Sequence, residues 1–396
     1  GWMDVLMVNS GPADFYTPPS PLKHALYKNN RDGTFTDVTE KAGITGQTFG
    51  MGCAIGDFDN DGYQDVFVTA YGRPFLYKNN GNGTFSDITE KAGLLKAPNW
   101  TTSAVWFDYD NDGRLDLFLC SFVEFSLKTN VFCGDNKLGR KFYCIPRVFR
   151  PTPSALFHNN GDGTFTDVSD KSGITKARGS YGMTAVAADF DNDGWPDIYV
   201  ACDTAPSLLY RNNHDGTFRE VAVPAGAAFD ENGEALAGMG VGVADYDGDG
   251  LLDIVRTNFS EQVTTLYRNY GGAFEVASIR AGLGVNRKYV GFGVDFADFD
   301  NDGWKDIFIA NRHVYAQIAG TKLHIPYRQP KILYRNLGTG RFADVSAAAG
   351  PAIQAENLGR GCAFGDFDND GDVDILVNNL DGPPTLLRND GAGRNG

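Results

Sequence analysis

The sequence lacks the features of membrane proteins and of disulfide-rich scaffolds. No apolar run approaches the roughly 18 residues that a membrane-spanning helix requires, so we expect no membrane span. Cysteine is scarce, with six residues in 396, which is too few for a fold held mainly by disulfides. Hydrophobic residues make up 42% of the chain, enough for a substantial core.

The chain also lacks recognisable catalytic motifs. There is no Gly-x-Ser-x-Gly elbow, phosphate-binding loop or haem motif. The five histidines, at positions 24, 158, 214, 313 and 324, show no spacing typical of metal ligands. We therefore expect a protein that is not an enzyme and has no catalytic residues.

What the chain does contain is a nine-residue acidic loop, repeated faithfully. Six copies carry Asp at positions 1, 3, 5 and 9 and Gly at position 6. Carboxylates at this spacing on one tight turn form the oxygen cage that Ca²⁺ requires, whereas Mg²⁺ keeps its waters and seldom takes an all-protein cage. The complete loops are residues 57–65, 108–116, 189–197, 245–253, 298–306 and 366–374, and a truncated copy spans residues 1–4.

We predict that these Asp loops bind six to seven Ca²⁺ ions with a structural role. Solvated turns are the alternative, since Asp and Gly are common in turns, but four clustered carboxylates would repel one another unless a cation neutralised them. The predicted ligands are the side chains at positions 1, 3, 5 and 9 and the main-chain carbonyl at position 7. They are Asp4; Asp57, Asp59, Asp61, Tyr63, Asp65; Asp108, Asp110, Asp112, Arg114, Asp116; Asp189, Asp191, Asp193, Trp195, Asp197; Asp245, Asp247, Asp249, Leu251, Asp253; Asp298, Asp300, Asp302, Trp304, Asp306; and Asp366, Asp368, Asp370, Asp372, Asp374.

The placement of charge matters more than the net charge of −15. The Asp residues at positions 1, 3, 5 and 9 of the complete loops, together with Asp4, account for 25 of the 50 acidic residues, and without them the chain has 25 acidic against 35 basic residues. Six bound Ca²⁺ would bring the formal charge from −15 to −3. The acidity is therefore metal-site acidity and not a surface for cationic partners.

The spacing of the loops predicts the fold. Successive ninth positions lie 51 to 81 residues apart, which fits a repeat of about 50 residues with insertions and four strands. In one unit, strands are expected at residues 49–56, 65–70, 74–79 and 84–89, with an Asn-Gly turn before the last. The first strand of each unit is rich in Gly and Ala, as the crowded axis of a propeller demands.

We predict an all-β fold, a single seven-bladed β-propeller over residues 1–396 with four-stranded antiparallel blades. The first blade lacks its inner strand and the last its outer strand, as in a ring cut within a blade. Because Gly1 lies inside a motif, we expect further residues upstream, with or without a secretion signal.

Long insertions point to the other face of the propeller. By strand alternation they emerge opposite the Asp loops, and propellers usually carry function on such loops. The insertions are residues 9–23, 120–155, 224–238 and 311–331. Two are basic and aromatic, and their candidate partner-binding residues are Arg140, Lys141, Tyr143, Arg147, Arg312, His313, Tyr315, His324, Tyr327 and Arg328. In the alternative interpretation, the aromatics plug the loops onto the blades and the charges are solvated.

The cysteines predict one disulfide. Cys133 and Cys144 flank a short segment of an insertion, where a bond would restrain the loop. Cys53 and Cys362 occupy equivalent inner-strand positions and are expected to be buried free thiols. Whether Cys120 and Cys202 meet is left open.

The Asp-x-Asp-x-Asp-Gly-x-x-Asp loops, the Phe49-Gly50, Tyr181-Gly182 and Phe292-Gly293 pairs, and the Leu-Tyr-x-Asn-Asn segments resemble the FG-GAP/VCBS repeat family. The calcium-loop propellers of that family include the head of integrin α chains. The segment from Asn79 to Thr89 and the insertion with Cys133 and Cys144 are closer to bacterial propellers with an ASPIC/UnbV tail and to the cartilage acidic protein family. The resemblance covers essentially the whole chain, except that no ASPIC/UnbV tail is present before Gly396. It implies fold and metal rather than a specific function.

We therefore expect an extracellular or periplasmic, calcium-stabilised module for binding, adhesion or assembly. Its expected partner is an extracellular protein or an anionic glycan, with self-assembly as a further form, and not nucleic acid. The alternative is a polysaccharide-active, lyase-like enzyme that uses His313, Tyr315, His324, Tyr327 and Arg328. A cleft lined by these residues would favour the enzyme.

Overall fold

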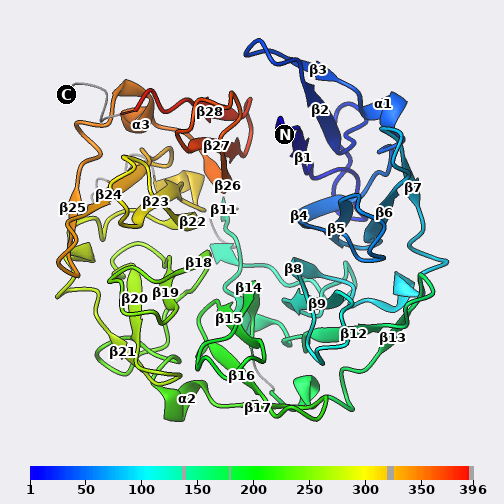
Figure 1. Cartoon of the computed structure of the whole chain (residues 1–396), viewed down its shortest axis with the longest axis horizontal. Helices are drawn as coiled ribbons and strands as arrows, with labels where there is room; N and C mark the ends of the chain where they lie inside the picture. Colours follow the sequence, from blue (N-terminus) through cyan, green and yellow to red (C-terminus); the bar gives the residue numbers. More distant parts are fainter. Residues whose placement is uncertain (136–139, 178–179, 319–324, 392–396) are drawn as a thin grey trace.

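Successive antiparallel strands group into seven sheets that follow one another around a ring (Figure 1). The computed structural model describes residues 1–135, 140–177, 180–318 and 325–391. Five sheets have four strands, and the first and last have three. The prediction of an all-β, seven-bladed propeller is confirmed.

Each sheet is one blade, with its strands in sequence order. Blade 1 contains β1 (Val5–Met7), β2 (Ala25–Asn29) and β3 (Phe35–Asp37). Blade 2 contains β4 (Phe49–Gly56), β5 (Asp65–Tyr71), β6 (Phe75–Asn79) and β7 (Phe85–Asp87). Blade 3 contains β8 (Thr101–Phe107), β9 (Asp116–Ser121), β12 (Ala155–Asn159) and β13 (Phe165–Asp167). Blade 4 contains β14 (Gly182–Ala188), β15 (Asp197–Cys202), β16 (Leu208–Asn212) and β17 (Phe218–Glu220).

The remaining blades repeat the pattern. Blade 5 contains β18 (Val241–Ala244), β19 (Asp253–Arg256), β20 (Thr265–Asn269) and β21 (Phe274–Val276). Blade 6 contains β22 (Gly291–Ala297), β23 (Asp306–Asn311), β24 (Ile332–Asn336) and β25 (Phe342–Asp344). Blade 7 contains β26 (Gly359–Gly365), β27 (Asp374–Asn379) and β28 (Thr385–Leu387).

Helices are short and lie between blades or in insertions. The α-helices are α1 (Thr39–Ala42), α2 (Ala222–Ala225) and α3 (Pro351–Gln354). The 3₁₀ turns are Leu94–Lys96, Pro146–Val148, Ile174–Lys176, Leu283–Val285 and Ala316–Ile318. No helix of the described residues is long and apolar enough to cross a membrane.

Small residues let the inner strands approach one another at the axis. Inner strands of neighbouring blades are in contact from β4 through β8, β14, β18 and β22 to β26. A Cβ at Gly240 would lie 1.8 Å from the carbonyl oxygen of Phe292, and one at Gly242 would lie 2.7 Å from Asp295 Oδ1. Neither contact is sterically possible, so glycine is required where blades 5 and 6 meet.

The core lies between the blades. Second strands such as β5 are buried along their whole length, because a neighbouring blade covers each of their faces. The tyrosine of the Leu-Tyr-x-Asn segment is also buried in blades 2, 4, 5 and 6, at Tyr77, Tyr210, Tyr267 and Tyr334. Apolar burial of this kind is the main favourable term in folding.

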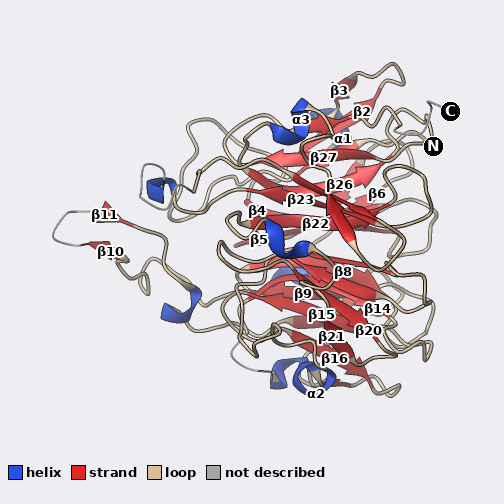
Figure 2. Cartoon of the chain, turned by 90° about the vertical axis from the view of Figure 1, so that its left-hand side faces the viewer, coloured by secondary structure: helices blue, strands red, loops and turns tan. Residues whose placement is uncertain are grey.

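The two ends of each second strand define two faces. In blade 3, the Asp loop joins β8 to β9 at one end of β9, and the long insertion joins β9 to β12 at the other. A short hairpin in this insertion, β10 (Gly134–Asp135) paired with β11 (Arg140–Lys141), stands out from one face of the disc (Figure 2). We call this side the insertion-bearing face and the opposite side the Asp-loop face.

The expected disulfide is confirmed. Cys133 and Cys144 are bonded, with their Cα atoms 5.3 Å apart. The other four cysteines are free thiols; Cys120 and Cys202 are buried in one cluster. Cys53 was expected to be buried, but its side chain is exposed, because β4 is the edge strand of its sheet and borders the axis of the ring (Figure 1); Cys362 is half-buried.

Candidate metal centres and the insertion-bearing face

Main-chain N–H groups fold each Asp loop around its first carboxylate. In the blade 2 loop, Asp57 accepts hydrogen bonds from the N–H groups of Asp61 and Gly62, at 3.0 and 2.8 Å. Asp61 accepts one from the N–H of Tyr63, at 3.0 Å. Position 4 has a left-handed φ of 56° in five loops, and in each of them it is Asn, which tolerates this conformation. The sequence therefore encodes the turn that gathers the carboxylates.

The carboxylate at position 9 is buried and links its own strand to the Asp loop and to the next strand of the blade. Asp65 starts β5, accepts from the N–H of Phe58 at 3.2 Å, and accepts from the N–H of Asn79 in β6 at 2.7 Å. Burial raises the pKa of Asp65 to about 6. In the same way, burial raises the pKa values of Asp116, Asp197 and Asp253 to about 7. A bound cation would favour the charged form that burial disfavours.

The carboxylate at position 3 carries the strongest indication of a ligand. In five loops one of its oxygens is buried and has no hydrogen-bond partner in the described part of the chain, at Oδ1 of Asp110, Asp191, Asp247, Asp300 and Asp368. An unpartnered buried oxygen costs free energy unless a cation or donor satisfies it. In three loops the carboxylates at positions 1, 3 and 5 lie within 4.8 Å of one another: those that begin at Asp57, Asp108 and Asp189. An all-oxygen set of this kind fits a hard divalent cation such as Ca²⁺.

A basic residue faces each of five loops, and our sequence interpretation missed it. The third residue of the Leu-Tyr-x-Asn segment pairs with position 3: Lys78 with Asp59, His158 with Asp110, Arg211 with Asp191, Arg268 with Asp247 and Arg335 with Asp300. A signal was available, because this position is basic in all seven repeats, with Lys28 and Arg388 completing the column. Arg388 pairs instead with Asp390.

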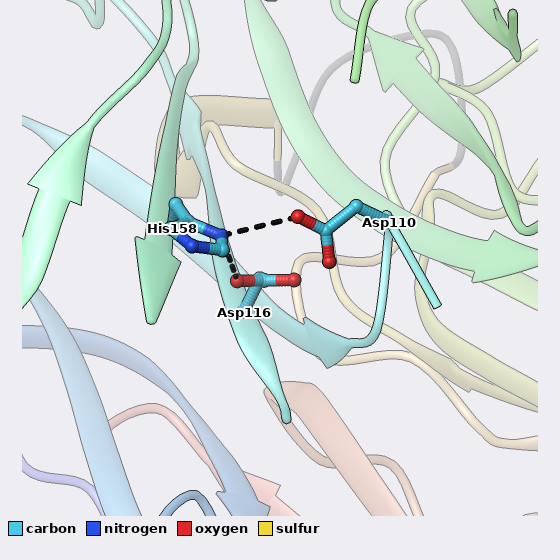
Figure 3. Close-up of side chains that lie close together, drawn as sticks. All are labelled: Asp110, Asp116 and His158. Carbon is cyan, nitrogen blue, oxygen red and sulfur yellow. Dashed lines mark ion pairs between the residues drawn. The ribbon is translucent and has the colours of Figure 1, made fainter. Parts of the chain in front are cut away.

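Blade 3 differs from the other blades at this position. His158 Nδ1 lies 3.4 Å from Asp110 and 3.2 Å from Asp116, and Figure 3 shows the ring directed at both carboxylates. The three side chains form a group whose ligand atoms lie within 4.8 Å of one another. The spacing of the histidines in the sequence did not indicate this contact, because it joins β12 to an Asp loop that lies far away in the sequence.

Asparagines at the ends of the third strands join neighbouring blades. Asn212 Nδ2 donates to the carbonyl oxygen of Tyr109 in blade 3, at 2.8 Å, and to that of Pro196 in its own loop, at 3.2 Å. The same link to the position 2 carbonyl of the preceding blade is made by Asn159, Asn269, Asn336 and Asn389. Asn29 donates to Phe367 at 2.8 Å and so joins blade 1 to blade 7.

The two basic, aromatic insertions meet across the insertion-bearing face. Tyr315 Oη donates to the carbonyl oxygen of Tyr143 at 3.4 Å, and the two rings lie 6.4 Å apart. Residues 172 apart in sequence are thus brought into contact, blade 3 with blade 6. Figure 1 places β11, the strand that precedes Tyr143, over the centre of the ring.

The other candidate partner-binding residues do not share one environment. Arg147 Nε donates to the carbonyl oxygen of Thr204 in blade 4, at 2.8 Å, so it anchors the insertion. His313 is 1% exposed and packs on Phe259 with a ring distance of 5.3 Å; burial lowers its pKa. Tyr327 is half-buried and Arg328 is exposed. Arg140 and Lys141 are placed by their backbone in β11, and His324 lies outside the described residues.

Two arginines gather at the axial end of this face. The Cζ atoms of Arg312 and Arg360 lie 4.5 and 4.7 Å from the centre of the same Phe292 ring. Arg312 was a sequence candidate and Arg360 was not. Sequence reasoning missed Arg360 because it stands in an inner strand and not in an insertion.

The repeated loops decide the family. The chain matches the FG-GAP-like repeat family over residues 1–68, 57–119, 148–200, 189–256, 245–309 and 325–377. The chain belongs to this family. The expected resemblance is thereby confirmed, and each matched segment contains one or two Asp loops together with strands of two successive blades.

This FG-GAP propeller is similar in sequence to cartilage acidic protein 1. It is 29% identical to the human protein over 228 residues and 28% identical to the mouse protein over 225 residues. Each alignment covers 50% of this chain and 30% or 31% of the relative. The aligned half of this chain therefore spans about a third of the length of each relative.

A solved structure shares the fold. The FG-GAP propeller superposes on an Agrocybe aegerita lectin that recognises non-reducing terminal N-acetylglucosamine, with a TM-score of 0.52. The match covers 98% of this chain and 90% of the lectin at 17% identity. At this identity the likeness shows the fold alone.

Proposed function

We propose that the chain is a secreted FG-GAP propeller, stabilised by Ca²⁺, that acts as a binding, adhesion or assembly module through its insertion-bearing face. The observation that carries this proposal is the contact between the insertions of blades 3 and 6 at Tyr143 and Tyr315. Tyr143 is 70% exposed. Exposed tyrosines in a held position are typical of binding surfaces.

The calcium part of the proposal is supported by the Asp loops. Unpartnered oxygens at position 3 and raised pKa values at position 9 both favour a bound divalent cation. The loops lie between strands within the blades, so the ions would hold β-hairpins together rather than face a partner. Extracellular Ca²⁺ is plentiful enough for low-affinity sites.

Secretion is supported by the disulfide. Cys133–Cys144 closes an insertion and not the core, and such bonds persist in oxidising compartments. The burial of His313 supports binding rather than proton transfer, since its ring is packed by Phe259 and Tyr315. We therefore propose that the face binds an extracellular protein or an anionic glycan without acting on it.

A glycan array and a capture experiment with extracellular proteins, both run at saturating Ca²⁺, test the proposal. The wild-type chain is compared with the Tyr143→Ser, Tyr315→Ser double variant. We expect binding by the wild type and its loss in the variant. Equal binding by both would contradict the assignment to this face, and turnover of a bound polysaccharide, followed by the absorbance of an unsaturated product, would favour the lyase.

A further inference from the structure

One position of the inner strand interrupts the regular strand pairing in most blades. It lies six residues before the first Asp of each complete loop. In five of the six inner strands the pairing register shifts at this residue, which is the mark of a bulge. Bulges direct a side chain away from the regular pleat. The residues at this position are Met51, Thr102, Met183, Met239, Phe292 and Arg360.

Arg360 is the charged member of this set. The others are apolar or small, and Met239, Phe292 and the half-buried Met183 share one apolar cluster. Arg360 stands beside that cluster, with its guanidinium carbon 4.7 Å from the centre of the Phe292 ring. A charge at a position that otherwise packs against apolar neighbours needs a specific reason.

Arg312 approaches the same ring from blade 6. Its guanidinium carbon lies 4.5 Å from the centre of the Phe292 ring. The residue is 6% exposed, and its Nε is buried without a hydrogen-bond partner among the described residues. Arg360 is half-buried, so the arginine pair remains open to solvent on one side.

Among the described residues, no ion pair joins either guanidinium group to a carboxylate. Burial first, and then Arg312, lower the pKa of Arg360 to about 9, which leaves Arg360 charged at neutral pH. Burial also lowers the pKa of Arg312. Asp203 lies toward Arg147 and Tyr315, and Asp295 accepts the N–H of Phe296 at 2.9 Å. Two like charges in a partly buried place are unfavourable, and an anion between them would relieve this.

Tyr143 indicates what kind of anion fits. It contacts Tyr315, and the ring of Tyr315 lies 5.8 Å from that of His313, which follows Arg312 in the chain. Guanidinium groups match a planar carboxylate through two parallel hydrogen bonds. Exposed tyrosine rings offer flat apolar surfaces for the face of a sugar ring.

We propose that Arg312 and Arg360 bind the carboxylate of an acidic sugar at the axial end of the insertion-bearing face, while Tyr143 and Tyr315 contact its ring. This inference rests on the proposed function and names the ligand class. Phe292 holds the two guanidinium groups in place. The carboxylate of the ligand supplies the negative charge that no described carboxylate provides to this pair.

Calorimetric titration tests the inference at saturating Ca²⁺. The probes are trisaccharides that end in galacturonate, glucuronate or sialic acid, each beside its methyl ester, which keeps the shape and removes the charge. We expect at least one acid to bind and its ester to fail. Arg312→Met and Arg360→Met should each weaken binding roughly tenfold or more.

The matched control is Arg341→Met. Arg341 is exposed and stands in the hairpin turn between β24 and β25 of the same blade, so this variant makes the same charge change away from the arginine pair. Its affinity should stay within about twofold of the wild type. Melting temperature establishes that each variant is folded, and if Arg312→Met does not fold, the partly exposed Arg360 carries the test with Arg360→Met and Arg360→Lys.

Other outcomes overturn the inference in distinguishable ways. Equal affinity for acid and ester, unchanged affinity in Arg360→Met, or no binding of any acidic sugar would show that the arginine pair is not a carboxylate site. Binding of a sulfated trisaccharide or triglutamate in place of the acidic sugars would reject the ligand class. The proposed function fails separately, if the Tyr143→Ser, Tyr315→Ser variant binds its array ligands or proteins as the wild type does.

Discussion

At the scale of single residues, buried side-chain amides join the blades. In every blade except blade 2, the asparagine of the Leu-Tyr-x-Asn column satisfies two main-chain carbonyl groups, one in its own blade and one in the preceding blade. In blade 4 these are the carbonyls of Pro196 and Tyr109. Buried main-chain groups must be paired. This amide therefore stabilises the packing of each blade against the preceding one.

Asn212→Ala should therefore destabilise the propeller much more than Asn213→Ala. Asn212 is 4% exposed, whereas Asn213 is exposed and donates only to Thr217. Leaving two buried carbonyls unpaired should cost roughly 2–4 kcal/mol, against less than about 1 kcal/mol at the exposed site. Denaturant unfolding at saturating Ca²⁺ measures the difference, and equal losses in the two variants would contradict the role of the amide.

His24 predicts an acid-sensitive contribution to stability. It is 1% exposed, its Nδ1 accepts from the N–H of Asn9 at 3.3 Å, and its Nε2 is buried without a partner. Burial lowers its pKa from 6.5 to about 4. The folded state thus favours the neutral ring, so this stability is present above pH 6.5 and is lost as the pH falls toward 4, by at most about 3 kcal/mol.

His24→Gln, which keeps an acceptor and removes the titration, should lose less stability than the wild type between pH 6.5 and pH 4. Melting temperatures measured across this window at saturating Ca²⁺ give the comparison. Parallel losses in the two proteins would assign the acid sensitivity to other groups.

At the scale of elements, each Asp loop combines four carboxylates with one base from the third strand. In blade 5, Arg268 pairs with Asp247 at 2.6 Å and with Asp249 at 3.2 Å. With a divalent cation bound, four negative charges would meet three positive ones, which leaves little net charge on the loop. The base therefore offsets charge without taking the buried oxygen that we assign to the metal.

Removal of Ca²⁺ with EDTA should lower the melting temperature markedly, because a ligand that binds only the folded state stabilises it. Asp247→Asn should bind one ion fewer than the wild type by native mass spectrometry at limiting Ca²⁺. Asp215→Asn, in the exposed hairpin turn before β17, serves as the control and should keep the full number. An unchanged melting curve in EDTA would contradict a structural role for the ions.

The disulfide belongs to the insertion and not to the blades. Cys133→Ser together with Cys144→Ser should leave the melting temperature of the propeller nearly unchanged, because the bond closes a separation of only 11 residues outside the blades. It should increase cleavage by trypsin within residues 128–147. A large fall in melting temperature would mean that the insertion supports the core.

Patterns that are local in sequence predicted the fold and the Asp loops. The carboxylates from Asp57 to Asp65 lie on one turn, and their spacing alone places them together. His158 beside Asp110 and Arg360 beside Phe292 could not be predicted in this way, because the register between strands and between blades decides those contacts. An alignment of the repeats does single out Arg360, since it stands where other blades have Met, Thr or Phe. The alignment does not show that Arg360 lies beside Phe292.

At the scale of the whole molecule, the stability of the ring is not uniform. Inner strands contact one another from β4 to β26, but blade 1 contributes no inner strand to this series. Blades 1 and 7 lie side by side (Figure 1) and are joined further out. Asn29 donates to Phe367 at 2.8 Å, and the rings of Phe35 and Phe367 are 6.1 Å apart. We therefore expect the ring to open first between blades 7 and 1.

Asn29→Ala tests this expectation against Asn269→Ala, the same change between blades 4 and 5. Hydrogen exchange at saturating Ca²⁺ should rise in β1–β3 and β26–β28 for Asn29→Ala, with blades 3 to 5 unaffected, because local opening breaks only the weakest interface. Asn269→Ala should instead lower protection broadly, since its interface also holds inner strands that cannot separate alone. If Asn29→Ala also lowered protection evenly around the ring, all seven interfaces would open together, and the junction between blades 7 and 1 would not be the weak point of the propeller.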